Sequence, residues 1–106
     1  MPKYLYQGSY TQVGAQGLLK EGGTSRKETV SKMVESMGGS LEAFYFAFGG
    51  TDICAIVDLP DHATAAALSI AVGAAGTINI TTTVLIDPEE IDAAAEKTVN
   101  YRPPGQ

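Results

Sequence analysis

The chain has 106 residues, of which 44% are hydrophobic and 18% are charged, and this composition is typical of one globular domain rather than of a disordered chain. Its formal net charge of −5 repels phosphate backbones, so we expect no nucleic-acid partner. The single cysteine, Cys54, excludes an internal disulfide, and no apolar run reaches membrane-spanning length or resembles a signal peptide; we expect a cytoplasmic protein without a membrane partner.

The N-terminal segment, residues 3–10, alternates between two kinds of side chain. Tyr4, Tyr6 and Tyr10 fall on one side, and smaller or aliphatic residues fall on the other. This period of two predicts a β-strand that carries three phenol groups on a single face.

Two helical segments follow this strand. Thr11 is a suitable cap for a short helix, which the pair Gly22-Gly23 ends. Ser25 and Glu28 have the spacing of a capping box and predict the start of a second helix. Apolar residues at helical spacing continue this helix as far as Gly38-Gly39.

The central stretch, residues 40–61, is the most informative part of the chain. Two arms rich in aromatic and β-branched residues flank the turn Gly49-Gly50-Thr51-Asp52, a pattern typical of a β-hairpin. Alternation places Phe44, Phe46, Phe48, Ile53, Ala55, Val57 and Leu59 on one side, and Leu41, Ala43, Tyr45, Ala47, Cys54 and Ile56 on the other.

Three further elements complete the chain. Asp61 is expected to cap an alanine-rich helix that Gly76 terminates. Residues 77–86 alternate and predict a fourth strand. Asp87, followed by proline and two acids, predicts a last helix as far as about Thr98.

The order of these elements is β-α-β-β-α-β with an extra C-terminal helix. It predicts an α+β protein with a ferredoxin-like, four-stranded antiparallel sheet and its main helices on one face. Residues 1–98 are expected to form the single domain, and residues 99–106 an extended tail, because Pro103 and Pro104 prevent a helix there.

Both faces of the hairpin are apolar, although an antiparallel sheet with one solvent-exposed face normally alternates apolar and polar residues along each strand. One layer of helices covers only one face, and an exposed apolar sheet is unusual for a monomer. We therefore predict a homodimer or higher homo-oligomer in which sheet faces sheet. The alternative is that the last helix or the tail of the same chain covers the second face.

The chain resembles GYD-domain proteins over most of residues 3–96. The matching features are the opening tyrosine strand, Gly38-Gly39 before an aromatic strand, the segment 48–53, and the alanine-rich helix before a threonine-rich strand. In the turn that names the family, Thr51 stands in place of the tyrosine. The resemblance implies a ferredoxin-like fold of the dimeric α/β-barrel type, whose wider superfamily includes ligand-binding modules, cofactor-free oxygenases and isomerases.

The candidate ligand-binding residues are four tyrosines, three of which share one face of the first strand and would line an aromatic pocket if that face borders the space between helices and sheet or between two sheets. They are Tyr4, Tyr6, Tyr10 and Tyr45. The alternative is that they pack in the core with their hydroxyl groups satisfied.

The candidate catalytic residues are His62, Tyr6 and Asp52. His62 is the only histidine, and histidine is the side chain that most often serves as a general acid or base; the alternative, which we favour, is a solvent-exposed residue in the first turn of a helix. Asp52 closes the hairpin, where an aspartate most often accepts hydrogen bonds from nearby backbone N–H groups. We expect no metal site, because too few ligands lie near this histidine.

One basic segment, residues 22–27, could hold a phosphate or carboxylate at a helix start, or could simply be a capped and solvated turn. It lacks the phosphate-loop pattern, and we expect no cofactor. Two functions remain open: a homo-oligomeric module that binds a small molecule or a partner, and a cofactor-independent enzyme, oxygenase- or isomerase-like, acting on an apolar or aromatic compound.

Overall fold

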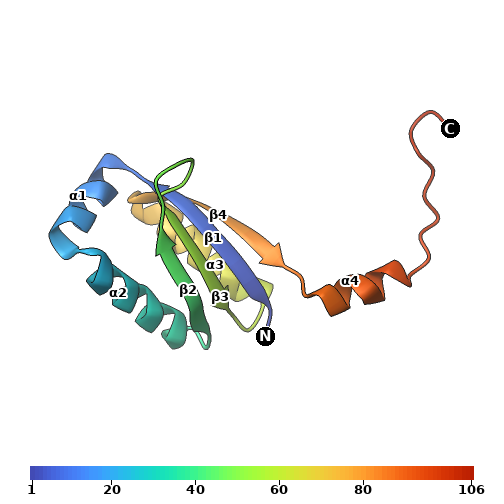
Figure 1. Ribbon diagram of the computed structural model, residues 1–106, viewed down its shortest axis with the longest axis horizontal. Helices are drawn as coiled ribbons and strands as arrows, with labels where there is room; N and C mark the ends of the chain where they lie inside the picture. The colour runs from blue at the N-terminus through green and yellow to red at the C-terminus, as the bar shows by residue number, and fades with distance from the viewer.

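The computed structural model describes all 106 residues and contains one four-stranded sheet with four helices (Figure 1). In chain order the elements are β1 (Lys3–Tyr10), α1 (Gln12–Glu21), α2 (Gly23–Ser36), β2 (Ser40–Phe46), β3 (Ile53–Asp58), α3 (His62–Ala75), β4 (Ile78–Leu85) and α4 (Pro88–Ala95).

The sheet has the strand order β2-β3-β1-β4, and every neighbouring pair is antiparallel. This is the predicted ferredoxin-like arrangement, with β1 and β3 in the centre. Helix α2 packs mainly against β2, and α3 packs against β4. Both helices lie on one face of the sheet, because Val34 of α2 and Leu68 of α3 enter the same buried cluster.

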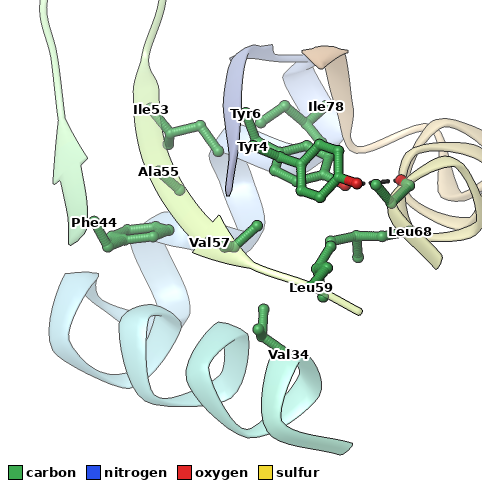
Figure 2. Close-up of a cluster of buried hydrophobic side chains, with 11 residues drawn as sticks. Tyr4, Tyr6, Val34, Phe44, Ile53, Ala55, Val57, Leu59, Leu68 and Ile78 are labelled. Atoms are coloured by element: carbon green, nitrogen blue, oxygen red, sulfur yellow. Dashed lines mark hydrogen bonds between the residues drawn. The ribbon is translucent and has the colours of Figure 1, made fainter. Parts of the chain in front are cut away.

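The hydrophobic core lies between this face and the helices. Alternate residues of β1 and β3 point into it, as the period of two predicts, and Figure 2 shows them turned toward α2 and α3. The most deeply buried large side chains are Tyr4, Leu59, Val34 and Val57. The aromatic rings Phe44 and Phe46 meet edge to face, with centroids 5.3 Å apart.

The sequence-based assignment of faces is wrong at both ends of the first hairpin arm. A β-bulge between Leu41 and Ala43 makes Leu41 pair with Val57, so Leu41 packs against the core instead of the opposite face. A bulge inserts one extra residue and therefore shifts the alternation of the strand. At the other end, Phe48 lies beyond β2 and is fully exposed.

The predicted caps have different outcomes. The Thr11 hydroxyl accepts a hydrogen bond from the backbone N–H of Gly14, and the Asp61 carboxylate accepts one from Thr64 at 2.8 Å, so both of these caps are confirmed. The capping box at Ser25 is wrong. The N-cap is Gly22, and helix α2 begins at Gly23, three residues earlier than this box predicts, because Gly22 adopts φ +86° and turns the chain directly from α1 into α2.

The opposite face of the sheet is covered by no helix. Leu5, Cys54 and Ile56 remain partly accessible there, and Tyr45 is 69% exposed. We call this surface the open face. At one end of this face Lys3 forms two ion pairs: its Nζ atom lies 2.7 Å from Glu42 and 2.9 Å from Asp58. The hydrogen bond to Glu42 contributes most to a raised pKa of Lys3, and the hydrogen bond to Asp58 contributes next.

The C-terminal arm, residues 86–106, extends past the end of β4 and away from the sheet (Figure 1). All of its residues are exposed, including Ile91, Val99 and Tyr101. Helix α4 ends at Ala95, slightly before the predicted Thr98, and does not cover the open face. The radius of gyration is 17.0 Å, against about 13 Å for a compact chain of this length, because of this arm. None of the helices is both long enough and apolar enough to cross a membrane.

Candidate functional site

The main concave feature is a cavity of about 420 Å³ between the sheet and the three helices α1, α2 and α3. Helices α2 and α3 lie on the same face of the sheet, α2 over the edge strand β2 and α3 over the edge strand β4, and α1 closes one end of the space between them. Of the 22 residues that line the cavity, 17 are hydrophobic. A space of this size and character is typical of a site for a small organic molecule.

Tyr6 and Tyr10 are the two predicted site residues that line this cavity. The hydroxyl group of Tyr6 donates a hydrogen bond of 2.7 Å to the carbonyl oxygen of Ala65 in α3 (Figure 2). Burial raises the pKa of both phenols, because the phenolate form loses its hydration there. Both groups are therefore neutral hydrogen-bond donors at neutral pH.

Tyr4 and His62 form a pair outside this cavity. Tyr4 Oη lies 2.6 Å from His62 Nδ1, and the two rings meet nearly at right angles. Tyr4 is 1% exposed, whereas His62 is exposed in the first turn of α3. Burial, followed by the charge of Asp61, raises the pKa of the Tyr4 phenol.

The other two candidates lie elsewhere. The Asp52 carboxylate accepts a 2.8 Å hydrogen bond from the backbone N–H of Tyr10, and its own N–H donates to the carbonyl of Gly8, so Asp52 ties the hairpin loop to β1. Tyr45 points to the open face, on the other side of the sheet from the other three tyrosines. The structure therefore gathers Tyr6 and Tyr10 at the cavity, but not His62, Asp52 or Tyr45.

Sequence reasoning missed the charged end of the cavity. Glu21 and Arg26 are its only charged lining residues, and Arg26 Nη1 lies 3.8 Å from Glu21 Oε2. Arg26 was noted only as part of the basic segment 22–27. The useful signal is the Gly22-Gly23 pair, which places the end of α1 beside the start of α2 and so brings these two residues together.

No three histidine, cysteine, aspartate or glutamate side chains gather in an arrangement that could hold a metal ion. The polar residues that line the cavity are the two tyrosines, Thr77 and the ion pair of Glu21 with Arg26. Such a set can bind and orient a small molecule through hydrogen bonds and apolar contact.

Comparison with known proteins agrees with the fold. No curated protein and no solved structure matches the chain significantly. The family model of the GYD domain, however, matches residues 4–95, which include all four helices and, apart from Lys3 at the start of β1, all four strands. The chain therefore belongs to the GYD domain family.

Proposed function

We propose that this protein is a homo-oligomeric module that binds a small apolar or aromatic compound in the cavity between its sheet and its helices. The observation that supports this most directly is the cavity itself, about 420 Å³ with 17 hydrophobic residues among its 22 lining residues. Tyr6 and Tyr10 would contact the ligand with their rings, and Tyr10, whose hydroxyl group donates to no protein atom, would orient it. Protein interiors are normally close-packed, so an unfilled space of this size in a small domain supports the proposal that a ligand occupies it.

A neutral apolar dye such as Nile red tests the binding site directly. We expect its fluorescence to rise on binding, with saturation at one dye per chain. The variant Val72→Trp places a large ring at a cavity-lining position of α3 and should weaken binding at least tenfold. Ile70→Trp is the matched control, since Ile70 is an exposed residue of the same helix that does not line the cavity. Equal binding by both variants and the parent would refute the site.

Self-association is supported by the open face, where apolar side chains of three strands lie uncovered. Burying one such side chain typically contributes about 1.5–3 kcal/mol, so pairing two sheets is strongly favourable. The exposed apolar residues of the C-terminal arm add surface of the same kind. A two-fold dimer is the simplest assembly that removes this surface from water.

Light scattering tests the assembly. Ile56→Lys introduces a charge in the middle of the open face and should shift the protein to single chains at micromolar concentration. Ala67→Lys makes the same change on the exposed surface of α3 and should leave assembly unchanged. A parent protein that is already a single chain at this concentration would contradict the proposal.

The second candidate function is a cofactor-independent enzyme that acts in the same cavity. The observation in its favour is that Tyr6 is a lining residue of the cavity and carries a phenol, which could exchange a proton with a bound compound. Aerobic incubation with a panel of small aromatic compounds, followed by mass spectrometry, would detect a product. This function requires Tyr6→Phe to abolish product formation while Nile red still binds. If the parent forms no product, the binding module is the better description.

A further inference from the structure

The charged end of the cavity has more hydrogen-bond donors than acceptors. Arg26 has five N–H donors, and its one charged contact, with Glu21, is a long 3.8 Å. The hydroxyl group of Tyr10 donates to no protein atom. The hydrogen bond between this residue and Asp52 is made by the backbone N–H of Tyr10 instead. Glu21, by contrast, already contacts Arg26 and also accepts from the Thr29 hydroxyl at 3.4 Å.

Two further features favour a negative group at this end. A phenol is protonated at neutral pH, and burial raises the pKa of Tyr10 further, so this group can only be a neutral partner that donates to an acceptor there. Arg26 also lies in the first turn of α2, whose N-cap residue, Gly22, provides no capping side chain. The positive end of the helix dipole therefore adds to the charge of Arg26.

We propose that the ligand of this cavity is an apolar or aromatic carboxylic acid whose carboxylate is held by Arg26 and Tyr10. The apolar body lies between α2 and α3, and the carboxylate accepts hydrogen bonds from the guanidinium and phenol groups at the charged end of the cavity. Glu21 positions Arg26 in the empty site and loses this contact when the ligand arrives. This inference rests on the proposed function, because it names the class of compound that the same cavity binds.

Three probes with one aromatic body test the inference: 2-naphthaleneacetic acid, its primary amide, and the corresponding 2-naphthaleneethylamine. We expect the parent to bind the acid at least about tenfold more tightly than the amide, because charge-assisted hydrogen bonds are roughly twice as strong as neutral ones. Arg26→Gln should remove this preference, because it weakens binding of the acid much more than binding of the amide. Tyr10→Phe should reduce the preference, and Glu21→Gln should increase it.

Lys27→Gln is the matched control, since it removes the same charge one residue further along α2, at a position that does not line the cavity. It should keep the preference for the acid. If Nile red and the amide bind but the acid has no advantage, or if the amine binds best, the inference fails while the proposed function stands. If none of these compounds binds, both fail. Equal loss of the preference in Arg26→Gln and Lys27→Gln would also overturn it, because a general charge effect would then explain the result.

Discussion

The packing of α1 against the start of β4 depends on the absence of a side chain at Gly14. A Cβ atom there would overlap the carbonyl oxygen of Thr77 and would lie 2.8 Å from its carbonyl carbon and 2.9 Å from Cδ1 of Tyr10. Gly17, one turn later on the same helix, would place a Cβ atom in open space. Replacing each glycine by alanine therefore makes the same chemical change with opposite expected effects.

The magnitudes follow from three contributions at Gly14. Overpacking costs about 1–3 kcal/mol. Moving α1 away from β4 also weakens the 3.0 Å hydrogen bond from Thr11 N to Thr77 O, at a cost of about 0.5–1.5 kcal/mol. Alanine regains about 0.5–1 kcal/mol through its better helix propensity. We expect Gly14→Ala to lose about 2 kcal/mol of unfolding free energy, and Gly17→Ala to gain about 0.5–1 kcal/mol.

Urea unfolding followed by circular dichroism measures both changes, and thermal melting checks them. A change of 1 kcal/mol shifts the Tm of a domain of this size by about 4 °C, so the two variants should differ by roughly 10 °C. Because α1 closes one end of the cavity, Gly14→Ala should also weaken Nile red binding. A Gly14→Ala variant as stable as the parent, or a Gly17→Ala variant destabilised to the same extent, would refute the reasoning.

Three other predictions concern the core and the arm. Tyr6→Phe removes the hydrogen bond to the Ala65 carbonyl and should lower the free energy of unfolding by about 1 kcal/mol; an unchanged urea midpoint would contradict this. Burial raises the pKa of Tyr4, Tyr6 and Tyr10 above 10.0, so these phenols ionise less readily in the folded state than in the unfolded state. The free energy of unfolding should therefore be highest at pH 8 and should decline as the pH rises beyond 10. Constant urea midpoints between pH 8 and 11 would count against this prediction. A chain that ends at Ile86 should unfold within about 0.5 kcal/mol of the parent when both are single chains, because the removed residues are all exposed, whereas a much larger loss would show that the arm supports the domain.

Part of the candidate site follows from sequence patterns. Alternation places Tyr6 and Tyr10 on one face of β1, and that face is the one the helices cover. The separation of Tyr45 from this set also follows from the pattern once the covered face is known, because Tyr45 lies opposite Cys54 on the open face. The pairing of Arg26 with Glu21 could not be predicted by periodicity, since it depends on the angle at which α1 meets α2, and Gly22 sets that angle.

The sequence by itself determined the order and type of the elements, the hairpin, and the caps at Thr11 and Asp61, because these depend on neighbours within a few residues. Only the tertiary structure decided which face Leu41 takes, since the bulge arises from the pairing of β2 with β3. The tertiary structure also decided the cavity and the direction of the C-terminal arm. Helices α2 and α3 leave a space because they pack over opposite edges of the same face, and α4 extends outward because the end of β4 directs it away from the sheet. These features depend on contacts between residues far apart in the chain, which a local pattern does not contain.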